Sequence, residues 1–575
     1  MPFQFSELLT KKDRERIYFD GGLPLSKRET RLERLEVSRR RLEAFIGSTR
    51  PGFTDHTLRT KPLLATPQMV FGHHLPPKRV PTLPENPFIV PGVLEDLKGR
   101  WDRHTIKTFV DPAPSNILHG VHGFVWEDIT AIVPGEADIF CARAASESGA
   151  AVLTGDSDLL VHDLGPSGSV IFFSSVESIE DNVDNERPKI RAMQIRPREV
   201  ARKLGIRSIQ RFAFELKRDP YLSFGKIVQR AKENTGGVEN NASYLAFLEE
   251  YTFINEDIED NIQGLDPRIS ELYLQLTHAG LHPENQPLAI YLPMLLENHF
   301  RRCAWREGSE IRAIAFSLLN FSATVGDKRD TILEYSRRGT RVSSTPIKLL
   351  SEDELISLIV TLNKRLQSLF MRCSGASILA WKMFALEEIF LHKDKDDWPS
   401  PGHLGRFLET GHRGEMLDWD DIHLNAQFQS ILYSLRILKQ AVGSSALQAP
   451  LALKNKIPLL QKFLYELPPM RMLSHSISDI STHEPMPRES VKHTLFVLFS
   501  GQKQDCDAQT PELGEPVQDH GNNRISTGHN ARTETTCTSR RKQGGQPVVT
   551  GHTVKLAKHT TNLFDILGDM DALEY

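Results

Sequence analysis

The sequence has few cysteines and no long apolar run, and these two absences exclude several classes of protein. Its 575 residues contain five cysteines, and no two of them form a CxxC pair. This spacing does not match a disulfide-stapled secreted domain or a zinc module built on paired cysteines. No run approaches the roughly 18 apolar residues of a membrane-spanning helix, and the start of the chain is too polar for a signal peptide. We therefore expect an intracellular protein, nuclear or cytoplasmic, with reduced thiols and no membrane contact.

A strong net charge is also missing. The formal net charge is −4, so the sequence as a whole does not predict attraction to nucleic acid, and any basic surface must be local. Residues 11–50 hold 12 Lys and Arg against 7 Asp and Glu, a local excess of five positive charges. The helix expected in this segment is either a surface that follows a phosphate backbone or a solvated amphipathic helix.

Strands and helices are expected to alternate in the first 200 residues. Apolar runs bounded by turn residues predict strands, and segments with helical periodicity lie between them. The predicted strands are 17–19, 128–133, 149–154 and 168–176, and the predicted helices are 26–45 and 136–148. This alternation predicts an α/β fold with a mostly parallel sheet and flanking helices. We assign it to a first domain, residues 1–215, in which the proline-rich segment 51–95 is a loop.

The rest of the chain is expected to be helical before it loses its large apolar residues. Ser351 and Glu354 form a capping box ahead of leucines at helical spacing, and similar patterns predict only helices through residues 216–500. Residues 501–560 are rich in Gly, Thr, Gln and Asn, which predicts a disordered linker. The end, 561–575, regains apolar residues among acids, as in a short motif that folds on a protein partner, or it is a frayed tail. Its apolar residues are Leu563, Phe564, Ile566 and Leu567.

Carboxylates follow the predicted strands at three places. They are Asp20, Glu136, Asp138, Asp156 and Asp158. The carboxyl ends of parallel strands meet at one edge of a sheet, so these acids are expected to converge there. Like charges held close together repel one another unless a cation neutralises them, and hard oxygen ligands suit Mg²⁺ or Mn²⁺. Each acid alone is explained as well by a helix N-cap or a turn, but the joint pattern favours a metal site.

Two stretches carry a resemblance to a known family. "PGEADIFCARAASESGAAVLTGDSDLLVHD" and "YFDGGLPLSKRETRLERL" resemble motifs of the flap endonuclease/XPG nuclease family, and the second is similar to its asteroid-type members. The resemblance implies a PIN-like fold that hydrolyses phosphodiester bonds in DNA or RNA, as in nucleic-acid processing or DNA repair. It also implies two Mg²⁺ or Mn²⁺ ions held by the five acids. Lys27 and Arg34 match the family's basic residues at the scissile phosphate, and the basic helix adds Arg28 and Arg31 as candidate nucleic-acid contacts.

The chain departs from the family's pattern at two points. The family has an earlier strand with a further metal-binding Asp, whereas 19 residues precede Asp20, and we expect none of them to supply that strand. Downstream, Asp219 in "KRDPY" is the nearest match to another family ligand, and an Asp that ends a helix before proline is the simpler interpretation. The alternative to an enzyme is therefore a degenerate PIN-like scaffold that binds nucleic acid or protein partners without cleaving.

Overall fold

The protein is described here by a computed structural model. The described residues are 16–23, 27–49, 86–100, 126–179, 189–233, 241–252, 260–277, 287–321, 328–373, 377–391, 399–410, 418–445, 451–470 and 488–504. The chain divides into a compact unit, Met1–Phe499, and a second unit, Ser500–Tyr575. In the described part of the chain, no helix has the length and apolar character needed to cross a membrane.

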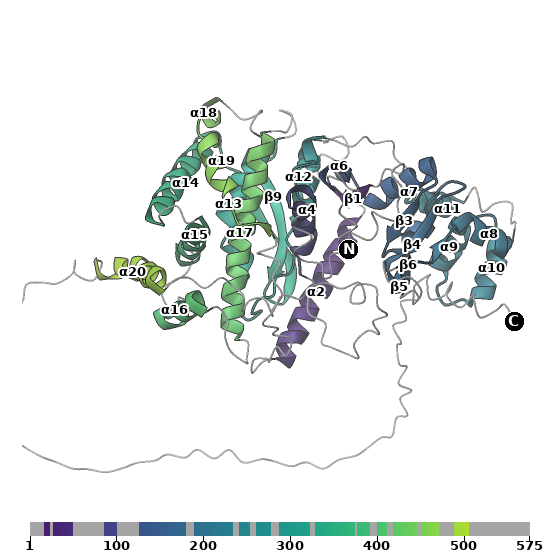
Figure 1. Ribbon diagram of the computed structural model, residues 1–575, viewed down its shortest axis with the longest axis horizontal. Coiled ribbons are helices and arrows are strands. Elements are labelled where there is room, and N and C mark those ends of the chain that lie inside the picture. The colour runs from purple at the N-terminus through teal and green to yellow at the C-terminus, as the bar shows by residue number, and fades with distance from the viewer. Residues whose placement is uncertain are drawn as a thin grey trace, which may run out of the picture. The chain divides into compact units, whose positions relative to one another are not determined.

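The first part of the chain has the predicted α/β order (Figure 1). Its elements are β1 (Ile17–Asp20), β2 (Thr130–Val133), α7 (Ala137–Ser148), β3 (Ala151–Thr154), β4 (Ser169–Phe172) and β7 (Gln194–Ile195). β1 pairs in parallel with β2, and β3 pairs in parallel with β4, whose other edge binds β7 antiparallel. The predicted α/β class with parallel pairing is confirmed.

Helix α7 joins the two small sheets. It contacts β1, β2 and β3, and the ring of its Phe140 lies 6.0 Å, centroid to centroid, from Tyr18 in β1. The helix ends at Gly149, whose φ of 73° is the left-handed conformation that glycine adopts freely at a helix C-terminus. α7 therefore holds the acid-bearing ends of β1 and β3 against one helix.

The later part of the chain contains the largest apolar core and is mainly helical. Its longer helices are α12 (Pro267–Thr277), α13 (Ser309–Asn320), α14 (Glu352–Arg372), α15 (Ser377–Leu391), α16 (Pro401–Thr410), α17 (Trp419–Ser445), α19 (Ile457–Tyr465) and α20 (Arg488–Gln504). The predicted capping box is present: Ser351 accepts a hydrogen bond from the Glu354 N–H, and the Glu354 carboxylate accepts one from the Ser351 N–H. Leu355, Leu362, Leu366 and Leu369 are buried in the core, whereas Leu358 is exposed, so the predicted helical region is confirmed here.

A three-stranded sheet interrupts this region, and the prediction of helices alone was wrong there. The strands are β8 (Ala289–Tyr291), β9 (Thr331–Arg338) and β10 (Arg341–Lys348), in the order β10–β9–β8. Two buried residues of β9 are charged: Glu334 pairs with Arg312, and Arg337 pairs with Glu297 at 2.7 Å. Because charged residues stand at buried positions, the apolar alternation that predicts a strand is hidden in the sequence.

Helix α4 (Ile89–Gly99) begins inside the segment that was predicted to be a loop up to residue 95. Pro91 is the third residue of this helix, and proline is tolerated in a first helical turn because its missing N–H would have no partner there. Leu94 and Leu97 are buried, so packing favours the helix. Residues 51–85 of the predicted loop, and the predicted linker 505–560, lie outside the described residues.

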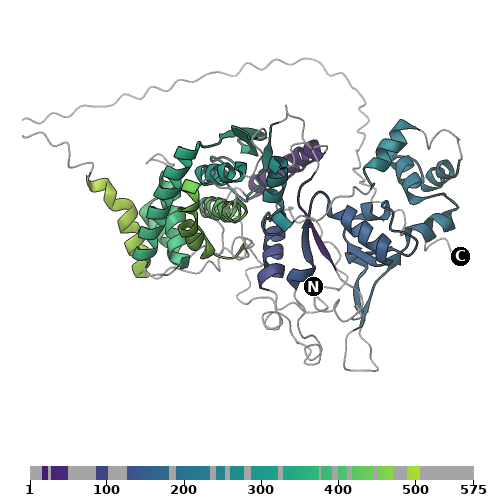
Figure 2. The same ribbon diagram turned by 90° about the horizontal axis from the view of Figure 1, so that it is seen from above.

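Helix α2 (Arg28–Ser48) connects the α/β part to the helical part. Its Leu42 and Phe45 pack in one cluster with Met294 and Trp419, and the Trp419 indole donates a hydrogen bond to the Thr49 carbonyl at 3.1 Å. α2 also contacts β10, and Figures 1 and 2 show this purple helix beside the teal elements of the later region. The basic helix is thus an internal connector as well as a surface.

One side chain takes the place of a partner strand on β2. The Ile132 N–H donates to the Gln263 side-chain oxygen at 2.9 Å, and the Gln263 amide nitrogen donates to the Ile132 carbonyl at 2.7 Å. Strand edges leave unpaired backbone groups, which must find partners when they are buried. Gln263 therefore completes the hydrogen bonding of the strand that leads into α7.

Replacing this side chain should open the edge of β2. Gln263→Ala removes both hydrogen bonds and should destabilise the strand by about 1–3 kcal/mol, so the Ile132 amide should exchange its hydrogen faster. Gln263→Glu keeps the acceptor for that amide and should preserve more of its protection. Hydrogen–deuterium exchange of peptides covering β2 measures this, and equal protection in the wild type and Gln263→Ala would contradict it.

Candidate metal centre

The first three acids meet where β1 and β2 end. The parallel register places Asp20 opposite Val133, three residues before Glu136. The carboxylate of Asp20 accepts a hydrogen bond from the Ala137 N–H at 2.7 Å, so it satisfies a free donor in the first turn of α7. Asp20 thus reaches from one strand end to the helix that begins after the neighbouring strand.

Two glycines allow this close approach. A Cβ on Gly21 would lie 2.4 Å from the Val133 carbonyl oxygen, which no side chain tolerates. Gly135 has a φ of 97°, a conformation that L residues rarely adopt, and its carbonyl accepts a hydrogen bond from the Gly21 N–H at 3.3 Å. The turn that positions Glu136 and Asp138 therefore depends on a glycine after each of the two strands.

The other two acids follow β3 in a tight turn. The Asp156 carboxylate accepts a hydrogen bond from the Asp158 N–H at 3.0 Å and caps the short 3₁₀ helix Ser157–Leu160. Leu159 and Leu160 are buried. Val161 packs in an apolar cluster with residues of α9 (Ile209–Arg218) and α11 (Ala242–Glu249). The buried leucines fix the turn, so the acids before them stand at the end of β3.

All five acids influence one another, with Asp138 in the middle. Burial and then the charges of Asp156, Asp20, Glu136 and Asp158, in that order of effect, together raise the pKa of Asp138 to about 7. Burial also raises the pKa values of Asp20 and Asp158. An acid whose pKa rises because like charges surround it is stabilised by any cation that binds there. The charges of all four other acids thus act on Asp138, and the shared role of the five acids in binding a metal stays a prediction.

The acids do not all point at one position. Among the described residues, no group of three or more His, Cys, Asp or Glu side chains is arranged to hold a metal ion. The hydrogen bonds explain this, since Asp20 accepts from Ala137, Asp156 accepts from Asp158, and Glu136 is ion-paired. The set has the right oxygen donors for Mg²⁺ or Mn²⁺, but its side chains would have to turn to share an ion.

Lys27 supplies positive charge at this cluster. Its ammonium lies 3.1 Å from the Glu136 carboxylate, with the two side chains 43% and 26% exposed. Lys27 also lowers the pKa of Asp158, as does Lys217 from α9 (Ile209–Arg218). Sequence reasoning found Lys27 but missed Lys217, because nothing in the local pattern links residue 217 to a turn some 60 residues earlier.

The other predicted nucleic-acid contacts have different surroundings. Arg34 is exposed, and its charge, after that of Arg31, offsets part of the rise that burial causes in the pKa of Asp20. Arg28 donates a hydrogen bond to the Tyr335 hydroxyl, and Arg31 pairs with Glu271. The guanidinium of Arg31 also lies 5.1 Å from the ring centre of Tyr291, which stacks on Tyr335. Arg28 and Arg31 therefore face the helical part of the chain.

Asp219 lies apart from the five acids in its contacts. It follows the last residue of α9 and pairs with Arg230 at 3.6 Å, and it is not among the charges that shift the pKa of Asp138. This matches the simpler interpretation of "KRDPY" as a helix end. The predicted partner motif at the C-terminus lies outside the described residues.

The raised pKa of Asp138 should make the stability of the folded protein depend on pH. Its folded pKa of about 7 lies above the roughly 3.9 of an unfolded Asp, so the folded state holds the proton more tightly. The stability from this proton is present at low pH and is lost as pH rises from about 4 to about 7. In EDTA, the urea midpoint should fall between about pH 5 and about pH 8 in the wild type, and it should fall less in Asp138→Asn.

The matched control for this test is Glu147→Gln, which removes a carboxylate from the exposed far end of the same helix. It should keep the pH response of the wild type. If Asp138→Asn and the wild type lose stability equally over this range, Asp138 titrates as an ordinary surface acid, and the electrostatic description of the cluster is wrong.

Comparisons with known proteins agree with the sequence motifs. Residues 85–349 match the family model described as XPG domain containing. A relative named Asteroid homolog 1, from Schizosaccharomyces pombe, is 25% identical over 224 residues, which cover 38% of this chain and 41% of that protein. No solved structure matches. The matched family region includes β2, α7, β3 and the four acids from Glu136 to Asp158. The matches to the XPG domain model and to Asteroid homolog 1 each cover less than half of this chain.

Proposed function

We propose that this nuclease-family chain hydrolyses phosphodiester bonds in DNA or RNA, with Mg²⁺ or Mn²⁺ bound among the five acids. The observation that supports this most is the position of Asp138, whose carboxyl is half-buried and is acted on by the charges of four other carboxylates. Such a group of hard oxygen donors without its own cation is expensive unless divalent ions bind. Two bound ions would supply an activated water and stabilise the charge that develops on the phosphate.

The residues that would hold the ions come from two strand ends and one helix. Asp20 and Asp156 are already fixed by backbone N–H donors, so their free oxygens have defined positions. Asp138 and Asp158 carry raised pKa values, and a bound cation would lower these values and keep both groups ionised at neutral pH. Glu136 would join them once it leaves Lys27.

The basic residues of α2 would act on the substrate phosphate. Lys27 is bound to Glu136 by an exposed ion pair, and such pairs contribute little, so a phosphate can compete for the ammonium. Arg34 is exposed at about one helical heptad from Lys27 and shares its face. Arg28 and Arg31 already bind Tyr335 and Glu271, so we assign them to holding α2 and keep Lys27 and Arg34 at the nucleic acid.

We also propose how the chain is organised around this activity. Residues 1–215 would be the nuclease domain and 216–500 the helical region, with 501–560 as a linker and 561–575 as a partner motif. The protein would work in nucleic-acid processing such as DNA repair, in the nucleus or the cytoplasm.

A specific observation supports a second candidate, a scaffold without cleavage. Asp20, Asp156 and Glu136 each have one carboxylate oxygen engaged by a donor of the chain itself, and the described residues contain no ready group of three metal ligands. A degenerate site of this kind would still present basic residues to nucleic acid. The two candidates differ in whether the acids bind divalent ions.

Removing a predicted ligand should abolish cleavage. The full chain should cut labelled single-stranded, flap or junction substrates in Mg²⁺ or Mn²⁺ and lose this activity in EDTA. Asp158→Asn should lower the rate at least about 100-fold, since a lost metal ligand removes several kcal/mol of transition-state stabilisation. Glu147→Gln, at the far end of α7 and outside the cluster, should cleave normally. Absence of both cleavage and Mn²⁺ binding by calorimetry would favour the scaffold.

Lys27 should matter for the rate more than for folding. Lys27→Gln removes the charge proposed to stabilise the phosphate and should lower kcat by roughly 10–1,000-fold while leaving the melting temperature nearly unchanged. Arg40→Gln is the matched control, because Arg40 is 71% exposed on the same helix and pairs only with nearby Glu36 among the described contacts. Equal rates for the two variants would exclude Lys27 from catalysis.

A further inference from the structure

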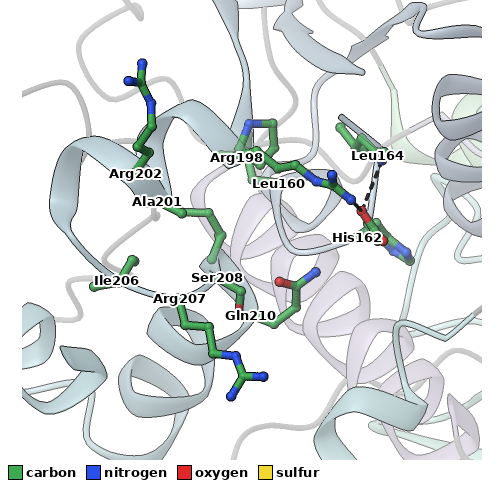
Figure 3. Close-up of a pocket in the computed structure, with 14 residues that line it drawn as sticks. Leu160, His162, Leu164, Arg198, Ala201, Arg202, Ile206, Arg207, Ser208 and Gln210 are labelled. Carbon is green, nitrogen blue, oxygen red and sulfur yellow. Dashed lines mark hydrogen bonds and ion pairs between the residues drawn. The ribbon is translucent and has the colours of Figure 1, made fainter. Parts of the chain in front are cut away.

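A pocket is lined by residues that follow Asp156 and Asp158 closely in the chain. It has a volume of about 570 Å³ and is bounded by residues 160–165 on one side and by α8 (Pro197–Leu204) and the start of α9 on the other (Figure 3). Gly205, with a φ of 66°, makes the turn between the two helices. The pocket is therefore built by the same part of the chain that places two of the five acids.

The polar lining of the pocket is mainly basic. Arg198, Arg202 and Arg207 line it together with one acid, Asp163, which leaves two net positive charges. Figure 3 shows these three arginines reaching out on different sides of the pocket. Arg198 and Asp163 are 3.3 Å apart, but their side chains are 58% and 70% exposed, and exposed pairs of this kind add little. The pocket thus favours an anion, and Arg198 can be drawn away from Asp163.

The start of α9 adds hydrogen-bond donors to the same pocket. Ile209 and Gln210 form its first turn and line the pocket, and backbone N–H groups in a first turn have no partner within the helix. The Ser208 hydroxyl accepts one hydrogen bond, from the Arg211 N–H at 3.2 Å. Helix N-termini of this kind attract phosphate groups, here in addition to the arginines.

The pocket is large enough for a ligand bigger than a phosphate ion. Its volume lies within the roughly 300–1,000 Å³ of small-molecule sites. Aliphatic side chains form much of its wall, including Leu160, Ile206 and Ile209, and Gln210 offers an amide that both donates and accepts. A ligand with an anionic end and a flat, partly apolar body with hydrogen-bonding edges matches this wall.

The pocket also borders the acid cluster. His162 lines it and is buried, with its ring 5.2 Å from that of Tyr251. Burial lowers the pKa of His162 to about 4, and Glu136, Asp156 and Lys27 also act on it electrostatically. Three residues separate Asp158 from His162 in sequence. A ligand in the pocket would therefore lie next to a nucleic-acid strand held at the acids.

We propose that this pocket binds one nucleotide unit, with its phosphate drawn to the basic lining that includes Arg202 and Arg207 and its base against the aliphatic wall. The unit is either a nucleotide of a bound single strand or a free nucleotide, since both present the same chemistry. The choice of a nucleotide rests on the proposed nucleic-acid function, whereas the preference for an anion follows from the pocket alone. Binding here needs no cleavage, so it can be tested in EDTA.

The experiment measures binding of a fluorescent single-stranded oligonucleotide of about 12 nucleotides to the full chain in EDTA by anisotropy. The double variant Arg202→Gln/Arg207→Gln should bind at least about tenfold more weakly, because each arginine–phosphate hydrogen bond is charge-assisted. The slope of log affinity against log salt should fall by roughly 1.4, since each lost contact to a single strand removes about 0.7. Asp163→Asn should bind more tightly than the wild type, because it removes the one acid of the pocket.

The matched control is Arg488→Gln/Lys492→Gln, which removes two charges from exposed positions on α20. It should leave affinity and slope unchanged, and melting curves check that all variants fold. If the pocket variant behaves like this control, the proposal is wrong. Competition with a nucleoside 5′-monophosphate that the pocket variant abolishes assigns the site to free nucleotides, and its failure while the oligonucleotide still binds assigns it to a strand. Inorganic phosphate that competes as well as the nucleotide would overturn the role of the base.

The result also separates this inference from the proposed function. Asp158→Asn should lose cleavage but keep binding that depends on Arg202 and Arg207. A chain that binds at the pocket yet never cleaves would leave the pocket in place and overturn the hydrolase.

Discussion

Repulsion among five carboxylates is the constraint around which the first part of this structure is organised. The acids are close enough that burial and the other four charges move the pKa of Asp138 to about 7. Backbone N–H donors at Asp20 and Asp156 and the Lys27 ammonium at Glu136 partly offset this repulsion. These partners make the fold possible without bound ions, and the same partners are the ones that divalent cations would replace. The competition between them is what distinguishes a nuclease from a scaffold.

Helix α2 links this cluster to the rest of the chain. Lys27 pairs with Glu136, and the charges of Arg31 and Arg34 act on Asp20, while Arg28 and Arg31 also bind Tyr335 and Glu271 in the helical part. Farther along, Phe45 packs edge to face on Trp419. A helix anchored by buried contacts holds its exposed cations at a fixed distance from the acids, which a freely solvated helix would not do. The later region thus positions the basic residues of the site.

The segment after β3 serves two neighbouring sites. Its first residues place Asp156 and Asp158, and its buried leucines anchor the turn against α9 and α11. The next residues form one wall of the arginine-lined pocket. Because one short stretch of chain holds both, a strand that meets the acids also comes close to the pocket. Phosphate recognition and metal chemistry would then be neighbours in the structure without sharing any residue.

The sequence by itself determined the α/β order, the helix between two strand ends, the capping box at Ser351 and the identity of the five acids, since each depends on local spacing or local chemistry. It did not show the β9–β10 hairpin, whose buried Glu334 and Arg337 are paired with Arg312 and Glu297 and conceal the apolar alternation. The sequence also could not distinguish the surroundings of Arg31 from those of Arg34, because the two residues lie three positions apart on one basic helix. Only the tertiary structure decided that one meets Glu271 and the other faces solvent, because charge partners far apart in sequence are chosen by packing.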